Sequence, residues 1–333
     1  MTQNISTTAD WRDPQFRSTV SRELVHRRSV SEVFPTAITK ASETEFTVCA
    51  QWPRWHVFYA PPNSSFDSAL VVETLRQLTV LIAHTYLRVP LGSPFLMPQI
   101  GVVMEANCSR DASRPVEVTA KVQVTNQRTS RHGVATFGTA AVFVVDGQEI
   151  ARGDATARIV DPAIYSRLRN AHVPSSTAGL VQPASAGDVG HLSDWNVVVG
   201  RPTEQRRWPL RVDTTNPILF DHPLDHIPGV LLIEAVRQAL RLEFEDPGLD
   251  FAAFESQFLA VAELGAEHDV VLESLTDDHG TLLAVAGVHA GDDVLMRTVA
   301  RIRRQPPQPF ALRPSSRLPR QQVLPDPGQN SHG

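Results

Sequence analysis

The sequence predicts an α+β fold in which one unit occurs twice, each unit being a long helix wrapped by a curved antiparallel sheet. A Glu-x-x-Arg-Gln pattern occurs at Glu73–Gln77 and again at Glu234–Gln238, at a constant offset of 161 residues. Segments that alternate polar and apolar residues follow each copy, as expected of strands with one buried face. We therefore expect the two units to pair as a pseudo-twofold dimer, with clefts where the helix of one unit meets the strands of the other.

The first unit is predicted to run strand, helix and then four strands. Residues 43–50 alternate in polarity, and Asp67 or Ser68 is a helix cap. The helix continues to about His84, because four apolar residues fall on one face: Val71, Leu75, Leu78 and Ile82. Strands are predicted at 100–108, 116–125, 133–145 and 149–160, and Asp146-Gly147 between the last two is a hairpin turn signal.

The second unit repeats this order after a linker at 174–190 that is rich in Ser, Ala, Gly and Pro. We expect a strand at 195–199, a broken strand at 209–220, a helix from Gly229 to about Phe244, and strands at 254–262, 268–275, 281–289 and 294–303. The chain thus divides into a flexible N-terminus (1–19), a first repeat (20–165), a linker (166–192), a second repeat (193–304) and a disordered basic tail (305–333).

Composition excludes several classes of function. The net charge is −5, and the tail from Arg301 onward holds six Arg and one Asp, so the body is acidic and is not expected to bind nucleic acid. No apolar run is long enough to span a membrane. Two cysteines, Cys49 and Cys108, cannot build a disulfide framework, so we expect a reducing cytoplasm. Neither of the two lysines follows a Gly, which excludes a P-loop and leaves Arg to bind any phosphate.

One stretch has an unusual density of polar groups ahead of an apolar helix. It reads FDHPLDHIPG at 220–229 and continues to Glu234 and Arg237-Gln238. This stretch closely resembles the A-factor-type γ-butyrolactone synthase (AfsA) family, as do residues 30–36, 50–54 and 73–77, and the similarity extends over roughly residues 20 to 303. The resemblance implies a tandem hot-dog fold, which agrees with the repeat.

The resemblance also implies a reaction. Members of the family make bacterial signalling lactones or butenolides that control antibiotic production. The implied step joins a β-ketoacyl thioester, carried by an acyl carrier protein (ACP) or CoA, to dihydroxyacetone phosphate. No cofactor or metal is expected, and the chain would act as a monomeric pseudo-dimer or a homodimer. One departure is at Phe66-Asp67-Ser68-Ala69-Leu70, where the first repeat of the family usually carries a His.

Acyl transfer from a thioester to a hydroxyl needs a base, donors for the developing oxyanion and a group that binds the phosphate. His222 or His226 could act as the base, and Glu234 could act in acid–base catalysis if burial raises its pKa. Gly229 would place free backbone N–H groups of a helix start near the thioester carbonyl. The predicted substrate-binding residues are Asp225, Arg237, Arg76, Glu73 and Arg54.

Each assignment has a structural alternative. The Glu73–Arg76 and Glu234–Arg237 pairs have the i, i+3 spacing of a structural ion pair. Asp225 could be a helix N-cap. His222 and His226 have the i, i+4 spacing of metal ligands on a helix, but the prolines between and after them break any helix. Two other functions stay open: a hot-dog thioesterase or dehydratase, and a degenerate regulatory member of the family.

Overall fold

A computed structural model describes residues 13–59, 66–106, 108, 110–111, 113–130, 133–170, 179–278 and 281–303. The predicted basic tail at 305–333 and most of the N-terminus at 1–19 lie outside these residues. Within them, no helix is long and apolar enough to cross a membrane.

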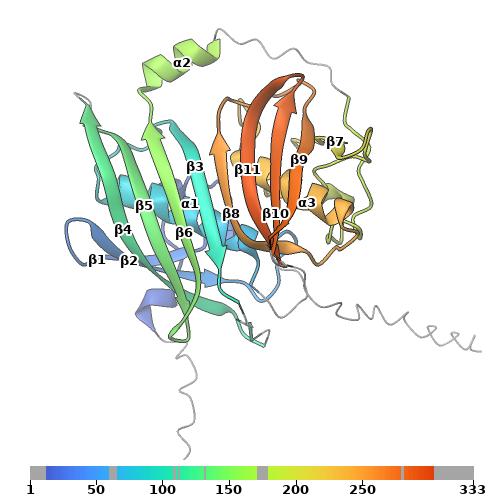
Figure 1. Cartoon of the computed structure of the whole chain (residues 1–333). Coiled ribbons are helices and arrows are strands. Elements are labelled where there is room, and N and C mark those ends of the chain that lie inside the picture. The colour runs from blue at the N-terminus through green and yellow to red at the C-terminus, as the bar shows by residue number, and fades with distance from the viewer. Residues whose placement is uncertain are drawn as a thin grey trace, which may run out of the picture.

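Within the described residues, eleven strands form one antiparallel sheet (Figure 1). Their bounds are β1 Pro35–Lys40, β2 Glu45–Trp52, β3 Phe95–Met104, β4 Val116–Ser130, β5 Gly133–Val145, β6 Gln148–Ile159, β7 Arg207–Pro209, β8 Asp250–Phe258, β9 Asp269–Asp278, β10 Thr281–Ala290 and β11 Asp293–Arg303. The strand order is β1-β2-β4-β5-β6-β3-β8-β11-β10-β9-β7. Outward from the β3–β8 pair, the order of elements in the two halves therefore matches.

The pairing of β3 with β8 joins the two halves of the chain into one sheet. Its register runs from Gln99 opposite Gln257 to Val103 opposite Ala253. Residues 95–98 of β3 have no partner in β8, although β3 continues alongside β6 with a register shift between Leu96 and Gln99. The two central strands therefore part at this end of the sheet.

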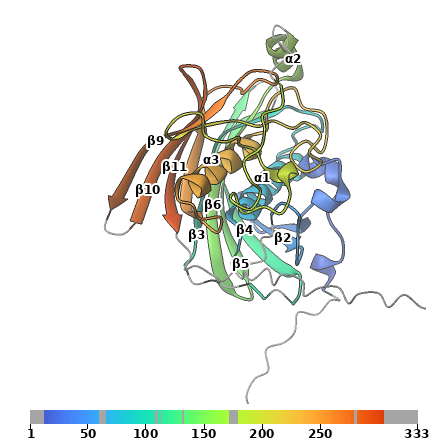
Figure 2. The same cartoon turned by 90° about the vertical axis from the view of Figure 1, so that its right-hand side faces the viewer.

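Two long helices, α1 (Ser68–Thr85) and α3 (Gly229–Glu243), lie against the same face of the sheet (Figure 2). Asp67 caps α1 by accepting a hydrogen bond from the Ala69 N–H at 2.8 Å, as predicted. Both helices are buried around most of their circumference, because the curved sheet covers one side and loops cover the other. The polar side chains on these helices are therefore desolvated and need partners inside the protein.

The strand predicted at 195–199 is reduced to a single bridge between Val199 and Leu210. Asp194–Asn196 form a 3-10 helix, which begins where the Ser193 hydroxyl accepts a hydrogen bond from the Trp195 N–H. The Gln238 side chain then accepts from the Val198 N–H and donates to the Asn196 carbonyl, at 2.9 Å each. A side chain thus bonds the backbone groups that a neighbouring strand would have bonded.

Three further features differ from the predicted elements. The broken strand expected at 209–220 is reduced to the short β7 and a single bridge at Leu210. Strand β1 was not predicted. A short helix, α2 (Pro162–Asn170), occupies the predicted end of the first repeat and start of the linker. Residues 171–178 of that linker lie outside the described residues.

Candidate functional site

A cavity of about 410 Å³ lies where the two halves meet. It is lined by the middle of α1, the start of α3, the first residues of β3, the loop at 219–228 and residues 258–262 after β8. Its walls near Leu96, Met97, Ile227 and Phe258 are apolar, and polar side chains gather near α1. A cavity of this size and composition is typical of a small-molecule site.

The parting of β3 and β8 accounts for this cavity. Phe95–Pro98 and Leu259–Ala262 both line it, on the two sides of the place where the ladder between the central strands ends. Leu259 is 58% exposed, so the cavity reaches the surface there. The predicted cleft between the helix of one unit and the strands of the other therefore corresponds to an observed cavity.

Two Asp–His pairs occupy the loop ahead of α3, and both histidines line the cavity. His222 Nδ1 lies 2.5 Å from Asp221 Oδ1, and His226 Nδ1 lies 2.6 Å from Asp225 Oδ1. Because a carboxylate only accepts, each Nδ1 must carry the proton, and each neutral ring then has its lone pair on Nε2. This arrangement is the one that a histidine base requires.

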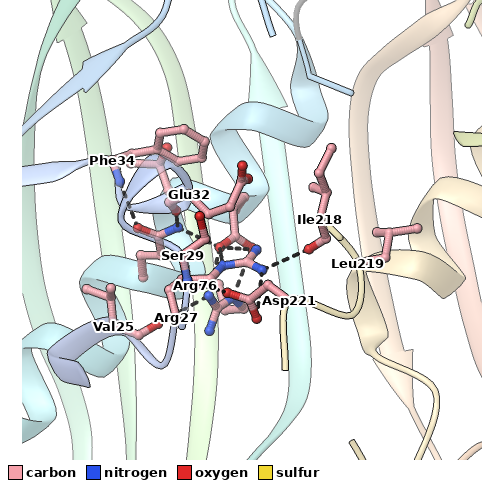
Figure 3. A network of polar contacts seen from close by, with 12 residues as sticks. Val25, Arg27, Ser29, Glu32, Phe34, Arg76, Ile218, Leu219 and Asp221 are labelled. Carbon is pink, nitrogen blue, oxygen red and sulfur yellow. Dashed lines mark hydrogen bonds and ion pairs between the residues drawn. The ribbon is translucent and has the colours of Figure 1, made fainter. Parts of the chain in front are cut away.

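Asp221 is held by the first half of the chain. It accepts a hydrogen bond from the Arg28 N–H at 2.8 Å and lies 3.6 Å from Arg27 Nη1 (Figure 3). Burial alone would raise the pKa of Asp221, but Arg27 and these hydrogen bonds outweigh burial and lower it. Asp221 therefore stays ionised and fixes the tautomer of His222.

Asp225 is not the N-cap of α3, since Pro228 holds that position. Its carboxylate accepts instead from the Tyr165 hydroxyl at 3.0 Å and from Arg169 Nε at 2.9 Å, both on α2. Arg169 also binds Glu263 through two hydrogen bonds of 2.6 Å. Burial and the hydrogen bond to Asp225 together raise the pKa of Tyr165 to about 12, so the phenol stays protonated.

Gly229 begins α3 at the cavity wall. The N-cap Pro228 offers no side-chain hydrogen bond, so the first N–H groups of α3 have no side-chain cap. A Cβ at Gly229 would lie 2.9 Å from the ring of Phe258, which also lines the cavity. The absence of a side chain thus allows Phe258 to lie against the helix start.

Sequence reasoning missed His26 and His84, which form a pair beside the cavity. His84 Nδ1 lies 2.8 Å from the Val89 carbonyl and must donate to it, so a neutral His84 accepts at Nε2. His26 Nε2, 2.8 Å away, is then the donor. Burial first, and then the charge of Arg76, lower the pKa of His26 to about 3, so the His26 ring is neutral. The contact joins residues 58 positions apart, so no local sequence pattern predicts it.

Glu234 and Arg237 lie behind the cavity and do not line it. Glu234 accepts from Arg237 at 2.7 Å, and from His191 and Gln238 at 2.9 Å each. Arg237 also donates to Asp67 on the other half at 2.6 Å. Burial alone would raise the pKa of Glu234, but Arg237 and His191 outweigh it and lower that pKa. These partners therefore keep Glu234 ionised, whereas acid–base catalysis by Glu234 would need burial to raise its pKa.

The equivalent glutamate of α1 has a matching set of partners. Glu73 accepts from Arg27, Arg76 and Gln77 at distances between 2.7 and 3.0 Å (Figure 3 shows both arginines). Burial opposes ionisation, but the two arginines lower the pKa of Glu73 to about 2. Arg76 lines the cavity, whereas Glu73 lies beneath it.

Arg54 is exposed and does not line the cavity; its carbonyl accepts a hydrogen bond from Arg110. Asp225 also lies outside the lining, although its partner His226 belongs to it. In the described part of the chain, no group of three or more His, Cys, Asp or Glu side chains could hold a metal ion. Of the predicted residues, the structure thus brings His222, His226, Gly229 and Arg76 together.

Comparison with known families identifies the chain. The A-factor biosynthesis hotdog domain (AfsA) matches residues 8–161 and 173–280. The chain belongs to the AfsA family. The hot-dog fold expected from the resemblance is thereby confirmed, and the single antiparallel sheet with its two long helices agrees with it.

Curated relatives are similar to the chain over most of their length. A "2-oxo-3-(phosphooxy)propyl 3-oxoalkanoate synthase" of Streptomyces virginiae is 36% identical over 74% of this chain and 84% of the relative. The enzyme of the same name from Streptomyces griseus is 30% identical over 83% of this chain and 93% of its own. A crystal structure described as an oleoyl thioesterase of Lactobacillus plantarum shares the fold, with 11% identity, a TM-score of 0.51, and coverage of 78% of this chain and 97% of that one.

Proposed function

We propose that the chain is an acyltransferase that joins a β-ketoacyl thioester to the hydroxyl of dihydroxyacetone phosphate, giving a 2-oxo-3-(phosphooxy)propyl 3-oxoalkanoate. The names of the curated relatives, which describe synthases of this ester, support the reaction. The observation in this chain that carries it is the Asp221–His222 pair at an apolar cavity. The product is the precursor of a butenolide or γ-butyrolactone signal.

His222 is the base in this proposal. Its Nε2 takes the proton of the substrate hydroxyl, while its Nδ1–H continues to donate a hydrogen bond to Asp221. The resulting alkoxide oxygen forms a bond to the thioester carbonyl carbon, and the carbon–sulfur bond then breaks. The thiolate leaves with the proton that His222 took, so the histidine returns to its neutral form. We choose His222 over His226 because the Asp221 side chain is only 2% exposed and is firmly held, whereas that of Asp225 is 43% exposed.

The start of α3 stabilises the negative charge on the carbonyl oxygen. The N–H groups of Gly229 and Val230 lie at the positive end of the helix dipole, and both residues line the cavity. The apolar walls beyond them accommodate the acyl chain. The two halves act as a tandem hot-dog pseudo-dimer, in which the second half supplies the base and the helix start and the first half covers them.

The two Glu–Arg pairs have a positioning role in this scheme. Glu73 fixes Arg27, which in turn lies against Asp221 and donates to the Ile218 carbonyl at 2.9 Å, so it holds the loop that carries His222. Glu234 and Arg237 join α3 to the start of α1 through Asp67. Neither Glu234 nor Arg237 contacts the cavity, so each acts on the reaction only through the structure.

The test is to incubate the purified protein with a 3-oxoacyl thioester, with and without dihydroxyacetone phosphate, and to analyse the products by mass spectrometry. The phosphorylated ester or its butenolide should form only when both substrates are present. Free 3-oxo acid, formed at the same rate with or without dihydroxyacetone phosphate, would instead identify a thioesterase. An enoyl product would identify a dehydratase, and no reaction at all would favour a regulatory member.

A further inference from the structure

Three arginines of the described residues line the cavity, and two of them, Arg27 and Arg76, already share a buried carboxylate partner. Arg27 binds Glu73 and the Ile218 carbonyl, and Arg76 binds Glu73 and the Val25 carbonyl. Their N–H groups hold the helix and the loop in place. A phosphate dianion would have to compete with a buried carboxylate for either of them.

Arg158 is different. It lies near the end of β6, it is exposed, and its guanidinium has no hydrogen-bond or ion-pair partner in the described part of the chain. An exposed arginine is commonly just hydrated, but this one lines the cavity. Its planar set of N–H donors suits the oxygens of a phosphate.

The pairing of the strands places Arg158 at the mouth of the cavity. Arg158 lies opposite Leu96 of β3, within the segment that has parted from β8. The neighbouring Phe95 ring is 5.2 Å from the ring of His26, centre to centre, which brings this end of β3 to the polar side of the cavity. Arg158 both lines the cavity and is exposed, so an anion in solvent can reach it.

We propose that Arg158 binds a phosphate group of a substrate at the mouth of the cavity. This inference rests on the proposed function, in which dihydroxyacetone phosphate carries a phosphate and the phosphopantetheine arm of CoA or an acyl carrier protein also carries phosphate. Phosphate held at Arg158 leaves the reacting end of either substrate directed inward, toward His222 and the start of α3. Arg158 is then a binding residue that selects phosphorylated substrates.

The experiment compares Arg158→Gln with the wild type by calorimetry on the full chain. The ligands are dihydroxyacetone phosphate, dihydroxyacetone, a 3-oxoacyl-CoA and the same acyl group on N-acetylcysteamine, which has no phosphate. Loss of a charge-assisted hydrogen bond should weaken binding of the recognised phosphate ligand by about 10- to 100-fold. Its phosphate-free counterpart should bind the variant and the wild type equally.

Arg152→Gln is the matched control. Arg152 lies on the same face of β6, but it pairs with Glu149 and does not line the cavity. A loss confined to the dihydroxyacetone phosphate arm assigns Arg158 to the acceptor, and a loss confined to the CoA arm assigns it to the donor. Unchanged binding of all four ligands, or an equal loss with and without phosphate, would overturn the inference. If the wild type binds the phosphate ligand through Arg158 but forms no ester, the proposed reaction would be wrong while the inference about Arg158 would stand.

Discussion

The starts of the two long helices occupy corresponding places, yet one faces a cavity and the other is filled. At the start of α3 the cavity measures about 410 Å³, whereas the space between Ser68 at the start of α1 and Arg237 on α3 is about 10 Å³, room for one water molecule at most. Phe58 and Tyr59 fill that place in the first half. The same framework therefore surrounds an open cavity at one helix start and close packing at the other.

The framework is the same because its polar residues make the same bonds. Gln77 donates to the Glu32 carbonyl and accepts from the Phe34 N–H. Gln238 makes the same two contacts with Asn196 and Val198. The difference lies in the residues around the framework: His26 lines the cavity, while Gly190, at the corresponding left-handed position in the second half, has no side chain. The residues that are repeated in both halves thus indicate the fold, and the residues that differ between the halves indicate where the cavity lies.

The largest expected effect separates the two buried ion networks. Arg237→Met leaves Glu234, Asp67 and Asp250 without their shared cation and should lower the free energy of unfolding by about 4 kcal/mol. Arg76→Met should cost only about 1 kcal/mol, because Arg27 still neutralises Glu73 and Arg76 is partly exposed. Urea denaturation measures both variants. Equal losses would show that the two networks contribute alike.

His222→Asn should lower the rate of ester formation by about 100-fold or more, because an amide can donate to Asp221 but cannot take a proton. Tyr59→Phe is the control at the filled site: the Tyr59 hydroxyl is buried and has no partner among the described residues. We expect it to leave the rate unchanged. Steady-state kinetics decide, and a slow Tyr59→Phe variant would mean that the filled site also participates.

Ser68 and Gly229 correspond at the offset of 161, but substitutions at them should affect different quantities, namely stability at Ser68 and KM at Gly229. Gly229→Ala pushes Phe258 into the cavity and should raise KM for long-chain thioesters about tenfold, with little change in stability. Ser68→Ala loses a 2.5 Å hydrogen bond to Asp250 and should cost about 1 kcal/mol while KM stays the same. An altered KM in Ser68→Ala would contradict the division of roles.

The smallest effect concerns pH. The pKa of His26 falls from 6.5 to about 3 on folding, so protonation favours the unfolded chain, and stability is lost as the pH falls from 6.5 toward 3. His26→Asn removes this proton site, and Asn tolerates the left-handed backbone with φ 52°. Its stability should fall less steeply between pH 6.5 and 5, by up to about 1 kcal/mol per pH unit. The free energy of unfolding is measured by urea titration at each pH. If it falls equally steeply with pH in the variant and the wild type, the role of His26 is refuted.

Sequence patterns were sufficient for the parts of the fold that obey a local period. The apolar spacing predicts α1 and α3 almost to the residue, and alternation with Asp146-Gly147 predicts the β5–β6 hairpin. The missed α2 did carry a local signal, since Asp161 accepts hydrogen bonds from the Ala163 and Ile164 N–H groups ahead of a helix with Pro at its first position.

The site was less predictable because long-range contacts assemble it. The loop with His222 and His226 was identified from its own residues, but its anchors, Arg27 on one side and Arg169 on the other, come from distant segments. Arg54 is predicted to bind substrate from its residue type and from the resemblance of residues 50–54, but neither places its side chain at the cavity. Arg158 became a candidate only when the strand register placed it beside Leu96.

The continuous ladder across β3 and β8 has an evolutionary consequence. Two identical subunits that associate through such an edge must carry two identical sites, since every mutation appears in both. A single chain that encodes both halves is free of this constraint: Ser68 and Gly229 can be selected independently, one for anchoring and the other for closeness to a ligand. Because one chain encodes both halves, the two helix starts can differ, with packing at one and a cavity at the other.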